Sequence, residues 1–204
     1  LTAVIDGGGR SLLAAAAAAG SLSGEQIASN AAVLLFGGIE TTEGMIANAV
    51  LHLLQTEAEV AATVAATTGG DPAAMDGVID ESLRLEPAAA VIDRYATADV
   101  SFGGAEIGRG ELVRLSLAGA NRDPAVFNDP DAFRPGRPNL RRHVAFAQGP
   151  HVCVGVHLAR LEARAALAAL LRDLPGLRLD PERPAEIRGL VFRKPPRLDV
   201  VWDS

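Results

Sequence analysis

A single cysteine, Cys153, stands in a short loop whose residue types could hold a metal ion. It lies within the segment Phe146-Ala147-Gln148-Gly149-Pro150-His151-Val152-Cys153-Val154-Gly155. An apolar pattern with helical spacing follows from about Val156, so the sulfur lies just before a predicted helix. Backbone N–H groups and the positive end of a helix both stabilise a thiolate. The loop therefore predicts a thiolate that can bind a soft metal.

Three residues of this loop favour a dry surrounding for the sulfur. Gly149 and Gly155 carry no Cβ, so the backbone can close tightly around it. The ring of Phe146 can shield one side. From these residues alone, two other interpretations stay open. The cysteine can be a small buried hydrophobic residue, or it can form an incomplete zinc or copper site with His151 and His157.

An apolar run over residues 23–54 predicts the longest helix of the chain. Ser23 is its expected N-cap, and Gln26 completes a capping box three residues later. The run is apolar on most faces, which predicts a helix that is buried centrally.

The middle of that run carries the sequence Gly37-Gly38-Ile39-Glu40-Thr41-Thr42. Two adjacent glycines predict a break or kink, since each costs ~1 kcal/mol relative to alanine in a helix interior. Gly38 lets a flat ligand approach the backbone. Glu40 and Thr41 place a carboxylate and a hydroxyl among apolar residues, and Thr41 can distort the helical hydrogen bonds. A kinked helix with solvated polar residues is the alternative.

Glu81 and Arg84 are three residues apart in a predicted helix over residues 71–85. They share one helix face and can pair. Pairs of this kind are common on surfaces, where they contribute little stability. On its own, this spacing favours a surface ion pair.

Together these motifs resemble the cytochrome P-450 monooxygenases. Phe-x-x-Gly-x-His-x-Cys-x-Gly, followed by Leu158-Ala159-Arg160, resembles the haem-binding loop of that family. Gly-Gly-x-Glu-Thr-Thr resembles the oxygen-binding kink of its long central helix. The resemblance covers nearly all of residues 21–202. It implies haem b (iron protoporphyrin IX) as the cofactor and Cys153 as the axial thiolate of the iron.

The resemblance also implies roles for other residues. Glu40 and Thr41 would form the acid–alcohol pair that delivers protons to dioxygen. Arg94 and His151 would reach the haem propionates, since arginine suits carboxylates as a bidentate donor. The residues implied to contact haem are Cys153, His151, Arg94, Phe146, Gly149, Gly155 and Gly38.

In the family, the Glu-x-x-Arg pair is buried and is joined by a second arginine. Here the segment Phe133-Arg134-Pro135-Gly136-Arg137 resembles the source of that arginine. The resemblance therefore places Arg137 with Glu81 and Arg84, in a cluster that supports folding and haem retention rather than chemistry.

The predicted elements indicate a mainly α chain with small β-sheets (α+β), similar to the C-terminal half of the cytochrome P-450 fold. Helices are expected over residues 11–19, 23–54, 57–68, 71–85 and 156–173, and strands over 90–95, 100–107 with a turn at Gly103-Gly104, and 111–117. Strand-like segments follow over 186–202.

We expect residues 1–204 to form a single partial domain. Because the chain begins at Leu1 and the family's chains are longer, we expect a fragment without the N-terminal part, inactive alone.

Composition limits the class of partner. The 204 residues carry a net charge of −6, which does not suggest a nucleic-acid partner. No apolar run reaches membrane-spanning length without a polar interruption. One cysteine cannot form an internal disulfide, which fits the cytoplasm.

The resemblance implies that one oxygen atom of O2 is inserted into a small organic substrate. Electrons would come from a ferredoxin-type donor with its reductase. Arginines 141, 142, 160 and 164 could form a basic face for an acidic electron carrier.

Two alternatives to the monooxygenase function stay open: a non-enzymatic haem-binding module and an inactive truncated product. His52 and His143 are expected to be structural.

Overall fold

The computed structural model describes residues 11–68 and 72–203. The chain divides into two compact units, Leu1–Glu40 and Thr41–Ser204, and the boundary falls inside one long helix. Each unit is described by itself. Within the described residues, no helix combines the length and the apolar character needed to cross a bilayer.

In the first unit, α2 spans Leu12–Ala18 and is capped by Ser11, whose Oγ accepts the Ala14 N–H at 3.1 Å. Helix α3 spans Gly24–Leu54 and continues into the second unit. Its capping box is confirmed. Ser23 donates its N–H to Oε1 of Gln26 at 2.8 Å, and its Oγ accepts the Gln26 N–H at 3.2 Å. These reciprocal bonds satisfy donors that the first helical turn leaves open.

Two expectations for α3 are wrong. The helix runs without a break through Gly37 and Gly38. Glycine weakens a helix without forbidding it, because the turns on either side keep their own hydrogen bonds. Residues 32–39 are also exposed rather than buried, with Val33 at 67% and Ile39 at 64%. Burying an apolar helix surface is favourable, but the sequence of the helix does not show whether another element packs over that surface.

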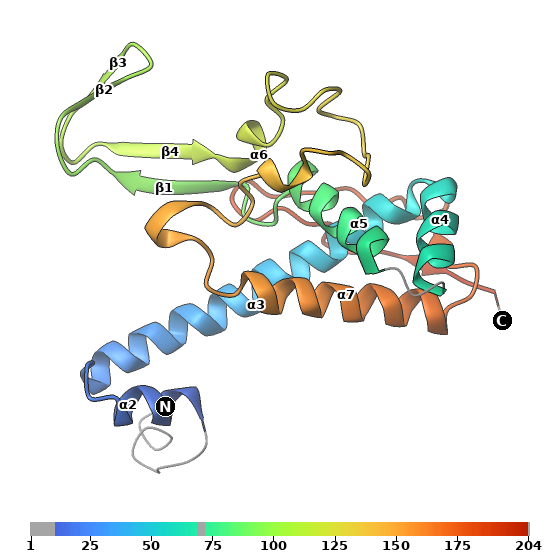
Figure 1. The fold of residues 1–204 in the computed structure, drawn as a ribbon, viewed down its shortest axis with the longest axis horizontal. Coiled ribbons are helices and arrows are strands. Elements are labelled where there is room, and N and C mark those ends of the chain that lie inside the picture. The colour runs from blue at the N-terminus through green and yellow to red at the C-terminus, as the bar shows by residue number, and fades with distance from the viewer. Residues whose placement is uncertain (1–10, 69–71, 204) are drawn as a thin grey trace. The chain divides into compact units, whose positions relative to one another are not determined.

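The second unit contains the C-terminal part of α3 and three further long helices among the described residues. Helix α4 spans Glu57–Thr68, α5 spans Pro72–Leu85 and α7 spans Val156–Asp173. The core joins the C-terminal turns of α3 to α5 and α7, and its buried members include Met45, Leu53, Val78, Ile79 and Leu167. Figure 1 shows α7 running beside α5. These bounds agree with the sequence-based helices because the apolar residues repeat at helical spacing.

In the part of the chain that the structure describes, the strands form three small antiparallel pairs, in agreement with the α+β prediction. Strand β1 (Val91–Tyr95) pairs with β4 (Leu112–Ser116), with Val91 opposite Ser116. Strands β2 (Val100–Phe102) and β3 (Ala105–Ile107) form a hairpin that extends from this ribbon (Figure 1). Its turn residues, Gly103 and Gly104, have φ of 59° and 81°, which glycine adopts readily.

Short elements complete the unit. Helix α6 spans Leu117–Ala120, the 3-10 helices η1 and η2 span Leu140–Arg142 and Gly149–His151, and β5 (Arg178–Leu179) pairs with β6 (Val200–Val201). Buried Asn48 donates Nδ2–H bonds to the carbonyls of Glu86 at 3.0 Å and Arg193 at 2.9 Å. It therefore ties α3 to the C-terminal segment.

Candidate functional site

Cys153 is exposed, in the loop between η2 and α7. Its N–H donates to the carbonyl of Phe146 at 2.9 Å, and the N–H of Val152 donates to the carbonyl of Gly149 at 3.1 Å. These two bonds close the chain into a tight loop directly before a helix. The position directly before a helix is the one the sequence predicted, whereas the dry surrounding expected for the sulfur is wrong, because Cys153 is exposed.

Two residues of the loop have a left-handed backbone: φ is 58° at Ala147 and 77° at Gly149. Glycine adopts this conformation freely, whereas an L-residue with a Cβ loses about 1–2 kcal/mol. Non-glycine residues persist in this region where the surrounding structure fixes them, and they cluster at binding sites. The loop therefore has an imposed shape rather than a relaxed one.

The two glycines of the loop, Gly149 and Gly155, differ in what they contribute. A Cβ on Gly149 would meet no atom within 4 Å, so its backbone angle, not crowding, favours glycine. A Cβ on Gly155 would lie 3.9 Å from Sγ of Cys153, an ordinary van der Waals contact. Gly155 thus leaves one flank of the sulfur open.

The surroundings of Cys153 fit haem better than a bare metal ion. Val152, Val154 and Leu158 are exposed, Val154 to 84%. Among residues 11–68 and 72–203, no three His, Cys, Asp or Glu side chains gather into a group that could hold a metal ion. One thiolate beside apolar side chains suits a metal that brings its own in-plane ligands in a flat, apolar ring, as haem does.

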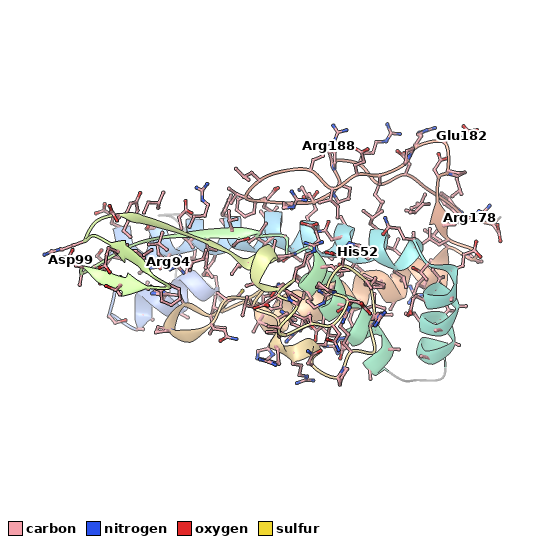
Figure 2. The ribbon with its side chains drawn as sticks, turned by 90° about the horizontal axis from the view of Figure 1, so that it is seen from above. His52, Arg94, Asp99, Arg178, Glu182 and Arg188 are labelled. Atoms are coloured by element: carbon pink, nitrogen blue, oxygen red, sulfur yellow. The ribbon has the colours of Figure 1, made fainter. Side chains whose placement is uncertain are left out.

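Arg94 and His151, the predicted propionate contacts, are both exposed. Arg94 lies on the β1–β4 ribbon, toward the end where Asp99 lies (Figure 2). Its Nη1 donates to the carbonyl of Asp93 at 2.8 Å, which leaves further guanidinium N–H groups for a carboxylate. Their assignment to propionates stays a prediction.

Gly38, Glu40 and Thr41 lie within about one turn of α3. A Cβ on Gly38 would meet open space, and the other two side chains are half-buried. Gly38 and Glu40 belong to the first unit and Thr41 to the second. Their catalytic and haem-contacting roles stay predictions.

Glu81, Arg84 and Arg137 form a buried cluster, which confirms the arrangement that the resemblance implied and not the surface pair that the spacing alone favoured. Arg84 Nε and Nη2 donate to Glu81 Oε2 and Oε1, both at 2.8 Å, and Arg137 Nε donates to Oε1 at 2.8 Å. The side chains of Glu81 and Arg84 are 0% exposed. The remaining Arg84 donors reach backbone carbonyls at 2.7–3.1 Å, those of Asn121, Pro130 and Ala132. The guanidinium is thus fully engaged.

Sequence reasoning missed the structural role of Asn121, which is completely buried. Its Oδ1 accepts the Val144 N–H at 2.7 Å, and its own carbonyl accepts from Arg84 at 3.0 Å. It therefore links the buried cluster to the segment preceding Phe146. No spacing in the sequence points to this residue.

His52 is structural, as expected. It is buried; its Nδ1 lies 2.9 Å from Ser82 Oγ, and its ring centroid lies 5.6 Å from that of Phe133 (Figure 2 labels His52). Burial, followed by the nearby positive charge of Arg122, lowers the pKa of His52 to about 4. The ring is therefore neutral at physiological pH.

The expected basic face is smaller than the sequence suggested. Arg160 pairs with Asp80 at 2.8 Å and Arg164 pairs with Asp76 at 2.9 Å, both across α5 and α7. These carboxylates offset their charges. Arg141 and Arg142 of η1 remain exposed, so only this pair keeps the predicted arrangement.

Comparison with known proteins agrees with this arrangement. The family model "Cytochrome P450" matches residues 72–200. The chain is 43% identical over 159 residues to 20-oxo-5-O-mycaminosyltylactone 23-monooxygenase of Streptomyces fradiae, covering 78% of this chain and 36% of that protein.

Two solved structures show the same fold. Ligand-free CYP164A2 of Mycobacterium smegmatis superposes with a TM-score of 0.88 at 35% identity, covering 98% of this chain and 51% of that chain. P450BioI, solved with an acyl carrier protein carrying hexadec-9Z-enoic acid, gives 0.80 at 37% identity, covering 89% and 46%. The chain thus spans between about a third and a half of the length of these relatives. Since the family model matches more than half of its residues, the chain belongs to the cytochrome P450 family.

Proposed function

We propose that this chain is the haem-carrying part of a cytochrome P450 monooxygenase, with haem b as cofactor and Cys153 as the iron ligand. The observation that carries the proposal is the closed, apolar-flanked loop around the sole cysteine. Membership of the family and the name of the Streptomyces relative, a monooxygenase, support the reaction class.

Haem would supply the redox chemistry that inserts one oxygen atom of O2 into an organic substrate. The chain's own residues would bind and orient it. Cys153 would donate negative charge from its thiolate, while Arg94 and His151 would donate hydrogen bonds to the propionates. Gly38 would let the flat ring approach α3, since its Cβ position is open.

Glu40 and Thr41 would handle protons. A carboxylate and a hydroxyl on adjacent residues of one helix can hold a proton and pass it on at the moment of oxygen reduction. Both side chains are half-buried, which limits their exchange with bulk solvent.

A ferredoxin-type protein with its reductase would supply the electrons. Exposed Arg141 and Arg142 offer positive charge to an acidic carrier. We place the chain in the cytoplasm, since its one cysteine cannot form an internal disulfide.

We expect the 204 residues alone to hold haem weakly or not at all and to hydroxylate no substrate, because the solved relatives are about twice this length. Haem is titrated into the purified chain, and the reduced, carbon-monoxide-bound spectrum is recorded. A thiolate-type Soret band that is lost in Cys153→Ser and kept in His157→Gln supports the proposed ligand. Haem that is bound with the same spectrum by the chain and by Cys153→Ser would refute it, and efficient turnover would refute the expected inactivity.

A further inference from the structure

The segment formed by residues 143–146, here called the loop anchor, holds the cysteine loop in place. The carbonyl of Phe146 accepts the Cys153 N–H at 2.9 Å, so movement of the anchor moves the backbone of the cysteine. On one side, the anchor is bound to Asn121 through the Val144 N–H. What fixes its other side is a carboxylate on α5.

That carboxylate is Asp80, which joins α5 to α7. Arg160 Nε and Nη2 both donate to its Oδ1, at 3.1 and 2.8 Å. The Asp80 side chain is only 13% exposed. Burial by itself would raise the pKa of Asp80, but polar contact with His143 and the charge of Arg160 outweigh it and leave this pKa below its ordinary value. Asp80 is therefore a largely buried anion at neutral pH.

His143 is the second group that faces Asp80. Its side chain is 3% exposed. Its Nδ1 accepts the Ala145 N–H at 3.2 Å, so a neutral ring carries its proton on Nε2. Nε2 lies 3.7 Å from Asp80 Oδ1, a polar contact longer than a hydrogen bond, and has no hydrogen-bond partner among the described residues. The carboxylate is thus the group toward which the ring is oriented.

Both groups also contact the ring of Phe146. The Arg160 guanidinium carbon lies 5.2 Å from the ring centroid, within the range of a cation–π contact. The ring centroids of His143 and Phe146 lie 6.2 Å apart. Asp80 therefore orients Arg160 and His143, the two side chains that pack against the ring of Phe146. The carbonyl of Phe146 in turn accepts the hydrogen bond from the Cys153 N–H.

We infer that Asp80 is a positioning residue for the cysteine loop, acting through His143, Arg160 and Phe146. It holds the loop anchor against α5 and α7, and so fixes where the sulfur of Cys153 lies. The consequence for haem rests on the proposed function, but the effect on the loop does not.

The first test needs no haem. Hydrogen exchange is measured on the chain, on Asp80→Asn and on Asp76→Asn. Asp76 is the matched control: it pairs with Arg164 across the same two helices, one turn earlier, and both side chains are half-exposed. We expect Asp80→Asn to raise exchange in residues 144–153 about tenfold or more while the rest of α5 is unchanged, and Asp76→Asn to leave the loop as it is.

Equal loop exchange in the two variants overturns the inference, as does a uniform rise along the whole chain. Should Asp80→Asn not fold, Arg160→Gln carries the same test, since it removes the partner and leaves the carboxylate. A rise confined to residues 144–153 is again expected, and its absence overturns the inference.

The second test uses added haem. Outer partners of metal ligands typically contribute 10–100-fold in affinity. We expect Asp80→Asn to weaken haem binding by about that factor and to shift the carbon-monoxide spectrum from thiolate toward thiol ligation, with partial rescue in Asp80→Glu. Unchanged affinity and spectrum overturn the inference. Should the unsubstituted chain bind no haem, hydrogen exchange alone decides on Asp80.

Discussion

Glu81 and Arg84 form a bidentate ion pair in which neither side chain is reached by solvent. Burying two charges is costly unless every donor and acceptor finds a partner. Here Arg137 and the Arg134 N–H also bind Glu81 Oε1, both at 2.8 Å. The cluster thus joins α5 to the irregular segment that leads to the cysteine loop, and its paired donors and acceptors make one arrangement of that segment strongly preferred.

Removing Arg84 should destabilise the chain far more than removing an exposed arginine of the same geometry. Arg84→Ala leaves Glu81 buried without its main partner, which costs about 3–5 kcal/mol. Arg84→Lys keeps a charge but not the planar fork, so an intermediate loss is expected. The free energy of unfolding in urea measures both.

Arg114 supplies the control, because its Nε and Nη2 bind Asp93 at 2.8 Å in the same bidentate way on the exposed β1–β4 ribbon. Water solvates both partners when that pair is broken. Arg114→Ala should therefore leave the urea midpoint nearly unchanged. Equal losses for Arg84→Ala and Arg114→Ala would contradict the role given to burial.

Local sequence signals predicted the helices, strands and turns, whereas the burial of individual side chains depended on tertiary packing. The capping box of Ser23 and Gln26 and the turn at Gly103 and Gly104 act within a few residues, so the sequence contains their whole cause. Whether the Glu81–Arg84 pair is buried depends on what packs over α5, and helix spacing carries no such information. The family resemblance supplied it.

The same reasoning explains the errors along α3 and the omission of Asn121. Apolar residues such as Val33 and Ile39 predict that a surface is favourable to bury, while exposure depends on segments elsewhere. Asn121 owes its role to backbone groups of Leu83 and Val144, each more than 20 positions away in sequence, at 3.5 and 2.7 Å. Contacts at such separations leave no periodic pattern.

The neutral, buried His52 should make the chain less stable in mild acid. Its pKa is about 4 in the folded chain and 6.5 as its ordinary value, so the unfolded chain binds more protons between these limits. The contribution of His52 to the free energy of unfolding is fully present above about pH 6.5. It is lost as the pH falls toward 4, by about 3 kcal/mol in all. Urea unfolding at several pH values between 7 and 4.5 measures this slope.

His52→Asn should flatten that part of the pH dependence, because the side chain no longer titrates while its amide can still bond Ser82. His157→Gln is the matched control, since His157 is exposed on α7. It should keep the slope of the unsubstituted chain. A slope that survives in His52→Asn would show that another group causes the acid sensitivity.

The left-handed backbone at Ala147 makes an opposite prediction, a gain in stability from glycine. Ala147→Gly relieves a conformation that costs an L-residue about 1–2 kcal/mol. The added freedom of the unfolded chain offsets roughly 0.4–1 kcal/mol of this. A small net stabilisation should remain, seen as a higher urea midpoint.

Ala125, exposed and without positive φ, is the control: Ala125→Gly should lower the midpoint, because only the entropic term applies. Should both substitutions lower the midpoint equally, the loop would hold no strain at Ala147, and its shape would be relaxed rather than imposed.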